Sequence, residues 1–85
     1  MNTYIRIVRD DTDRYHIECH DWVSATQYRV YNIRIINVPK HLRGYIFNGH
    51  HFGTPNRTAI FRTEKHAQKV ATALTILGSN EEGAH

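Results

Sequence analysis

The sequence predicts an α+β fold in which an antiparallel sheet of four to five strands is packed by one C-terminal α-helix. The first 62 residues contain short segments that alternate apolar and polar side chains, with turn-forming residues between them, and one helical apolar pattern follows. With 85 residues, 40% of them hydrophobic, the chain can build one core but not two. We therefore expect a single domain over residues 1–78 and a flexible polar tail over residues 79–85.

The first two strands are expected over residues 4–9 and 15–20. Both segments alternate apolar and polar side chains, and the aspartates between them belong to a residue type that stabilises turns by bonding its own backbone. The two strands should therefore form a β-hairpin. Its core face is expected to carry Ile5, Ile7, Tyr15, Ile17 and Cys19.

The third strand is expected to be the longest, over residues 27–38, because this segment is rich in β-branched and aromatic residues. Its alternation breaks near Asn32, which predicts a bulge or burial on both faces, and Pro39 should end it. Shorter strands are expected over residues 44–47 and 58–62. The Asn48-Gly49 pair predicts a hairpin turn, after which His50, His51 and Phe52 would pair back briefly.

The C-terminal helix is expected over residues 64–77. Thr63 is a suitable N-cap residue and Gly78 a suitable stop. The apolar positions recur at helical spacing and should face the sheet: Ala67, Val70, Ala71, Leu74 and Leu77. The opposite face of the sheet would then be the binding surface.

The composition argues against two classes of protein. The single cysteine, Cys19, cannot form an internal disulfide, so a disulfide scaffold is excluded. No apolar run approaches the roughly 20 residues of a membrane helix, and the N-terminus lacks a signal-peptide pattern. We therefore expect a cytoplasmic protein with no membrane partner.

Charge is distributed unevenly along the chain. Residues 1–26 hold three arginines against five acidic residues, a net charge of −2, whereas residues 27–69 hold eight basic residues against Glu64 alone, a net charge of +7. If this excess lies on one face, it favours an anionic partner such as nucleic acid or an acidic protein surface. The alternative is that these charges only solvate strand faces.

Aromatic residues and arginines interleave over residues 27–34, a pattern that suits base stacking and phosphate neutralisation. The Arg43-Gly44-Tyr45-Ile46-Phe47 segment resembles the basic-Gly-aromatic-x-aromatic strand of RNA-recognition motifs, although the βαββαβ order of that fold is absent. The predicted binding residues are Arg29, Tyr31, Arg34, Arg43, Tyr45 and Arg57.

The seven histidines raise the alternatives of metal binding and catalysis. His16 and His20 lie two repeats apart on a strand whose Cys19 points to the other face, so these three side chains cannot close on one ion without distortion. We therefore expect no metal and no cofactor. A metal-independent ribonuclease could use His41, His50 or His51 as acid and base, with Arg43 or Arg57 holding phosphate. No nucleophile with an oriented base is visible, so no catalytic residue is assigned.

A small single-domain chain with no catalytic signature and a lopsided charge resembles, in kind, the small proteins with which phages block host machinery, of which anti-CRISPR proteins are the best-known group. No residue motif carries this resemblance, so it implies no site. Many anti-CRISPR proteins are acidic, and a basic one would bind an acidic protein patch or bridge a nucleoprotein complex and its nucleic acid.

The sequence thus predicts a non-enzymatic binding module that inhibits a host nucleic-acid-processing complex through a basic and aromatic surface. The expected partner is a host protein, a nucleoprotein complex or nucleic acid. Two alternatives stay open: a direct single-stranded RNA- or DNA-binding protein, and a small metal-independent ribonuclease or toxin. A homodimer through an edge strand, either the first or the last, is also possible.

Overall fold

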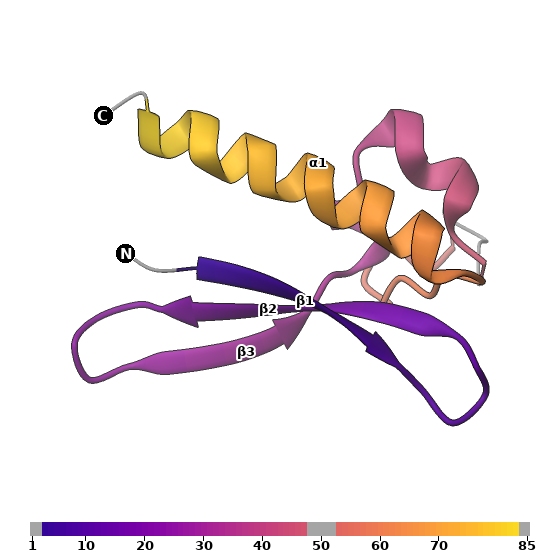
Figure 1. Cartoon of the computed structure of the whole chain (residues 1–85), viewed down its shortest axis with the longest axis horizontal. Helices are drawn as coiled ribbons and strands as arrows, with labels where there is room; N and C mark the ends of the chain where they lie inside the picture. The colour runs from indigo at the N-terminus through magenta and orange to yellow at the C-terminus, as the bar shows by residue number, and fades with distance from the viewer. Residues whose placement is uncertain (1–2, 48–52, 84–85) are drawn as a thin grey trace.

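The computed structural model describes residues 3–47 and 53–83, with side chains described as far as residue 75. It contains three strands and one α-helix, with two 3₁₀-helices between β3 and α1 (Figure 1). The elements are β1 (Thr3–Arg9), β2 (Tyr15–Trp22), β3 (Tyr28–Asn32), η1 (Ile35–Asn37), η2 (Lys40–Tyr45) and α1 (Glu64–Gly83). The α+β class, the antiparallel sheet and the C-terminal helix are confirmed. The described residues form one sheet of three strands, not four or five.

β1 and β2 form the predicted hairpin, and β2 is the central strand in the order β1-β2-β3. The turn is held by Asp10, whose Oδ1 accepts hydrogen bonds from the backbone N–H of Thr12 at 2.8 Å and of Arg14 at 3.0 Å. Asp13 takes a left-handed conformation with φ 59°, which aspartate tolerates better than most residues. Local turn chemistry therefore sets this hairpin.

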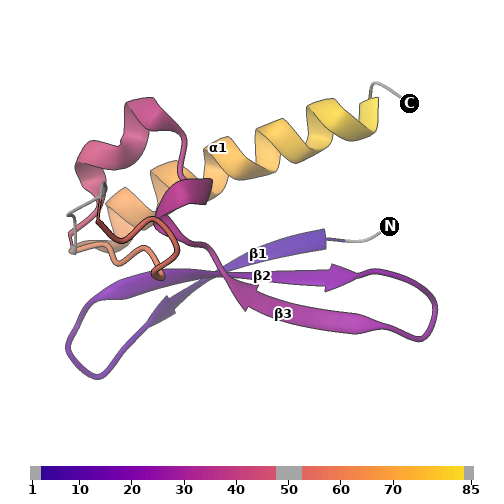
Figure 2. The ribbon, with the colours of Figure 1, turned by 180° about the vertical axis from the view of Figure 1, so that it is seen from behind.

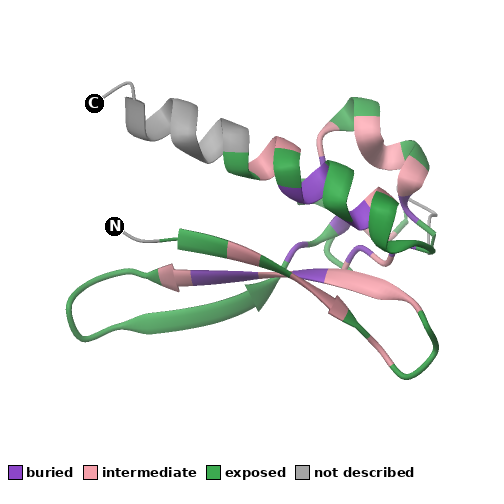
Figure 3. Ribbon diagram, in the orientation of Figure 1, coloured by how far each residue is buried: buried purple, intermediate pink, exposed green. Residues whose placement is uncertain are grey.

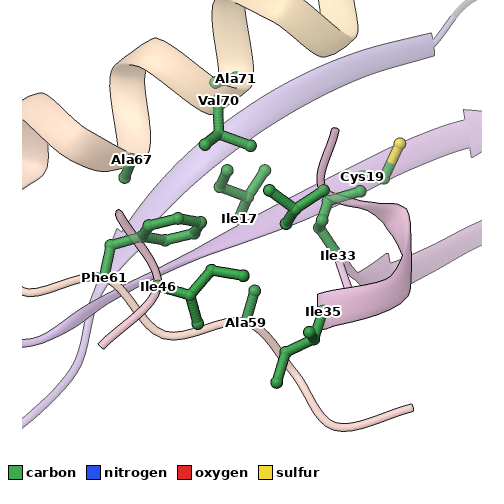
Figure 4. Close-up of a cluster of buried hydrophobic side chains, with 11 residues drawn as sticks. Ile17, Cys19, Ile33, Ile35, Ile46, Ala59, Phe61, Ala67, Val70 and Ala71 are labelled. Atoms are coloured by element: carbon green, nitrogen blue, oxygen red, sulfur yellow. The ribbon is translucent and has the colours of Figure 1, made fainter. Parts of the chain in front are cut away.

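The core lies between the sheet and α1, with one face of the hairpin turned toward the helix. Ile5 pairs with Cys19 and Ile7 with Ile17, so these side chains share that face as predicted. Figure 4 shows Ala67, Val70 and Ala71 of α1 pointing toward Ile17, and Phe61 lies beside them. The buried hydrophobic side chains are Ile17, Cys19, Ile33, Ile35, Val38, Ile46, Ala59, Phe61, Ala67, Val70 and Ala71.

The third strand ends at Asn32, and the prediction that it continues to Val38 is wrong. The N–H of Ile33 still donates to Ile17 at 2.8 Å, but its carbonyl accepts from Ala59 at 2.9 Å. The chain thereby leaves β2 and pairs with residues 57–59, then turns into η1. This change of partner buries both Ile33 and Ile35. It explains why the apolar–polar alternation breaks near Asn32, where the sequence predicted a bulge or burial on both faces.

The predicted strands over residues 44–47 and 58–62 are also wrong. Pro39 precedes η2, and its carbonyl accepts from the N–H of Leu42 at 2.9 Å, so the chain coils through Tyr45. Only isolated bridges remain: Ile46 with Phe61, Tyr15 with Phe61, and Arg34 with Thr58. The expected Asn48-Gly49 turn and the pairing of residues 50–52 lie outside the described residues.

The helix begins as predicted, since Thr63 Oγ1 accepts a hydrogen bond from the N–H of His66 at 3.2 Å. It does not stop at Gly78 but continues to Gly83, so the expected boundary between residues 78 and 79 lies inside it. A glycine in a helix interior costs only about 1 kcal/mol relative to alanine, which one residue alone does not turn into a stop. No helix in the described part of the chain is long and apolar enough to cross a membrane.

Candidate functional site

An open depression of about 670 Å³ lies beside β3, and we call it the β3 groove. It is lined by Arg29, Tyr31, Asn32, Arg34, Asn37, Asn56 and Thr58. Three of the six predicted binding residues, Arg29, Tyr31 and Arg34, therefore come together, and three asparagine amides surround them. The groove combines cations, one aromatic ring and groups that both donate and accept hydrogen bonds.

The groove stays open because α1 contacts β1 and β2 and leaves β3 uncovered. Arg29 pairs with Asp21 and Tyr31 with Cys19, so both side chains project from the face of the sheet on which the helix lies. The expectation that they lie on the opposite face is wrong. Figure 3 shows β3 exposed along its whole length and α1 above the other strands.

Arg29 is held in place by Asp21 across the sheet. Its Nε and Nη2 donate to Asp21 Oδ2 at 3.1 and 2.9 Å, while Thr3 Oγ1 donates to Asp21 Oδ1 at 2.9 Å. These hydrogen bonds, from Thr3 first and then Arg29, lower the pKa of Asp21. The Arg29 guanidinium lies 5.2 Å from the centre of the Tyr31 ring. The cation and the ring thus form one preorganised pair.

Tyr31 presents a neutral ring to the groove. A hydrogen bond with the Cys19 side chain, together with partial burial, raises the pKa of Tyr31 to about 12. The phenol therefore stays protonated at physiological pH and adds no negative charge beside Arg29. With 40% of its surface exposed, the ring is available for stacking.

The second wall of the groove is built by the pairing of residues 33–35 with residues 57–59. Arg34 Nη1 donates to Asn56 Oδ1 at 3.4 Å, and the N–H of Arg34 donates to Asn37 Oδ1 at 3.1 Å. These bonds fix both asparagine side chains next to the arginine. Asn37 and Asn56 were not predicted as site residues, because only this long-range pairing brings them to β3.

The other three predicted residues lie elsewhere, and two of them have structural contacts. Arg43 is half-buried and donates to the carbonyls of Val38 at 3.1 Å and Ile36 at 3.3 Å. Tyr45 packs against His66 of α1 with tilted rings whose centres are 4.6 Å apart. Arg57 is exposed in the loop next to the groove but does not line it. Because Gly44 and Tyr45 belong to η2, the similarity to an RNA-recognition-motif strand does not extend to the structure.

Sequence reasoning missed an aromatic cluster on the opposite face of the sheet, formed by Tyr4, His20, Trp22 and Tyr28. Tyr4 stacks on His20 with ring centres 4.5 Å apart, and Trp22 lies 4.8 Å from Tyr28. His20 is only 8% exposed; its Nδ1 is hydrogen-bonded to the Tyr28 hydroxyl and its Nε2 to Glu18 at 2.9 Å. Side chains alternate between the two faces along β1, β2 and β3, so the sequence would indicate that these four residues share a face once the register of the strands is known.

Two of the described histidines flank one carboxylate, with the Nε2 atoms of His16 and His20 lying 4.0 and 2.9 Å from Glu18. Cys19 is buried in the core, whereas His20 points to the opposite face. Within residues 3–47 and 53–83, no three histidine, cysteine or acidic side chains are placed to hold a metal ion. His41 is exposed on η2, and the His50-His51 pair of the ribonuclease alternative lies outside the described residues.

Comparison with known proteins adds no relative, since no protein-family model, curated protein or solved structure matches this chain. The functional assignment therefore rests on the residues of the chain itself. Among the surfaces formed by the described residues, the β3 groove combines positive charge, an available ring and polar amides.

Proposed function

We propose that this chain is a non-enzymatic binding module that holds a single strand of RNA or DNA in the β3 groove. The observation that carries the proposal is the Arg29 guanidinium over the Tyr31 ring, with Arg34 and three asparagine amides beside it. Single-stranded nucleic acid needs these three elements together: cations for phosphate, a flat ring for a base, and amides for base edges.

The fixed geometry of the groove supports this proposal over a purely solvated surface. Asp21 orients Arg29, and Asn56 accepts a hydrogen bond from Arg34. Both arginine side chains are therefore partly ordered before the strand binds, which lowers the entropy cost of binding. The Asp21 carboxylate cancels part of the charge of Arg29, which leaves Arg34 and the nearby Arg57 as the main attraction for phosphate. The net charge of +7 over residues 27–69 adds a long-range attraction.

The inhibitor role follows as an extension of the same binding. A complex that processes nucleic acid must expose a single strand at some step, and a small protein that holds that strand would compete with the complex for it. The partner would then be the strand within a nucleoprotein complex of the host.

The test is the affinity of short labelled single-stranded and duplex oligonucleotides over a range of salt concentration. We expect single strands to bind more tightly than duplex, with an affinity that falls as salt rises, by a slope of about 0.7 per phosphate neutralised. Arg34→Ala should weaken binding and reduce that slope. Arg6→Ala removes an exposed arginine from the opposite face and serves as the matched control.

Two results would count against the proposal. The first is no binding of single strands at low salt, and the second is an equal loss in the Arg34→Ala and Arg6→Ala variants. Mass analysis of the oligonucleotides after incubation detects cleavage and so tests the ribonuclease alternative. Cleavage that is lost in His50→Ala or His51→Ala would replace the binding proposal with that activity.

A further inference from the structure

β3 is an edge strand with an open side. Within residues 3–47 and 53–83 it pairs with β2 alone, and all five of its residues are exposed. Tyr28, Val30 and Tyr31 are exposed by 45, 48 and 40% and are among the large hydrophobic side chains left on the surface. Figure 2 shows no element beside the outer edge of β3. The segment has no proline, lysine or bulge of the kind that protects edge strands from pairing.

The hydrogen bonds at its two ends show which backbone groups of β3 point outward. The N–H of Ile33 donates to Ile17, and the N–H of Val23 donates to Gln27, so both are hydrogen-bonded pairs of the β2–β3 ladder. Such pairs alternate along an antiparallel ladder. Arg29 and Tyr31 therefore bond to β2, and the N–H and C=O groups of Tyr28, Val30 and Asn32 point away from it.

We infer that β3 pairs with β3 of a second copy of this chain, antiparallel and across a two-fold axis at Val30. In this register Val30 lies opposite Val30, and Tyr28 lies opposite Asn32 of the second copy. Every outward residue then meets an outward residue. Each of the three pairs exchanges two backbone hydrogen bonds, and the two sheets become one.

The side chains favour this register over its neighbours. Arg29 lies opposite Tyr31 of the second copy, so each cation meets a ring across the axis. A shift by two residues in one direction sets Arg29 against Arg29, and a shift in the other sets Tyr31 against Tyr31. Either shift also moves one outward residue beyond the end of the partner strand. In the first register the exposed Val30 side chain meets Val30 of the second copy on the axis.

This pairing does not depend on the proposed nucleic-acid binding. A strand added at the edge lies in the plane of the sheet, so the open side of the β3 groove stays accessible. The two grooves would lie next to each other across the axis. Of the two strands expected to form a dimer edge, residues 58–62 form no strand, whereas β1 is an edge strand. We place the dimer at β3 because all five of its residues are exposed, while β1 includes partly buried residues.

The experiment is the mass in solution of the purified chain without nucleic acid, measured by sedimentation over a range of protein concentration. We expect wild type to approach twice its monomer mass of 10.0 kDa. Val30→Lys places like charges opposite each other on the axis and should return the mass to that of the monomer. Val23→Lys, at an exposed valine outside β3, should leave the dimer intact. Circular dichroism checks that both variants fold.

A second measurement covers the case in which Val30→Lys does not fold. Val30→Cys should be crosslinked between copies by a short bismaleimide, whereas Arg6→Cys, in the centre of the other edge strand, should not. Wild type, in which Cys19 is buried, gives the background level of crosslinking. A monomer at every concentration, equal effects of the two lysine variants, or crosslinking through Arg6→Cys would each overturn the inference.

Discussion

Arginines that look alike in the sequence occupy three different environments in this fold. Arg29 is paired with Asp21, Arg34 reaches Asn56 at the groove, and Arg43 donates to two backbone carbonyls. Arg43 and Arg29 find their partners five to eight residues away, whereas Asn56 lies 22 residues from Arg34. At the scale of single residues, the fold therefore decides which cations remain for a ligand.

Arg43→Ala should lower stability and leave nucleic-acid affinity unchanged. Removing the guanidinium frees the carbonyls of Val38 and Ile36, and we expect a loss of about 1–3 kcal/mol in the free energy of unfolding. Urea unfolding measures this loss. Arg34→Ala should show the reverse pattern, with weaker binding and little change in stability. The assignment of Arg43 to structure would be refuted by a stable variant that binds less.

Asp10 and Asp21 should make the fold sensitive to acid. A hydrogen bond from the Thr12 hydroxyl lowers the pKa of Asp10, and one from the Thr3 hydroxyl lowers the pKa of Asp21. Each folded-state pKa lies below its unfolded value, so the stabilisation is full above the unfolded pKa and is lost as pH falls through the folded pKa.

Thermal unfolding should therefore occur at progressively lower temperature as pH drops roughly from 5 to 2. Asp10→Asn should be less stable than wild type at neutral pH, and its unfolding temperature should fall less on acidification. Asp11→Asn changes an exposed neighbour in the same turn and is the control. If the unfolding temperature of Asp10→Asn fell with pH as steeply as that of wild type, the Asp10 carboxylate would not contribute to the acid sensitivity.

At the scale of elements, the sequence was sufficient where structure is local. The hairpin of β1 and β2 follows from alternation and from Asp10, and the start of α1 follows from Thr63. Residues 33–38, 44–47 and 58–62 were predicted as strands and form none, because residues 33–35 pair with residues 57–59 and residues 40–45 coil into η2. Ile33 bonds to both Ile17 and Ala59, which no local pattern encodes.

Phe61 is the residue through which this irregular segment joins the core. It bridges Tyr15 and Ile46 and is fully buried. Phe61→Ala should cost about 3–5 kcal/mol in the free energy of unfolding, because a large cavity is left behind. Phe47→Ala removes a ring that is 42% exposed and should cost much less. Chemical denaturation of the two variants compares them directly, and equal losses would contradict the described core.

At the scale of the whole molecule, the fold presents two surfaces on opposite sides of the sheet. The sequence placed Arg29 and Tyr31 of the groove on one strand, but Asn32 of the same strand was not among the predicted residues. Asn37, Asn56 and Thr58 were not predicted either, because the pairing of Arg34 with Thr58 brings that wall into place. The aromatic cluster was also missed, as its members come from three strands whose register the sequence does not display.

The most direct test of the central claim is a residue-by-residue map of amide chemical shifts when a short single-stranded oligonucleotide is added to the isotope-labelled protein. We predict the largest changes at the β3 groove, in Arg29, Tyr31, Arg34 and Asn56. Changes confined to the aromatic cluster, or none under conditions of low salt, would contradict the account.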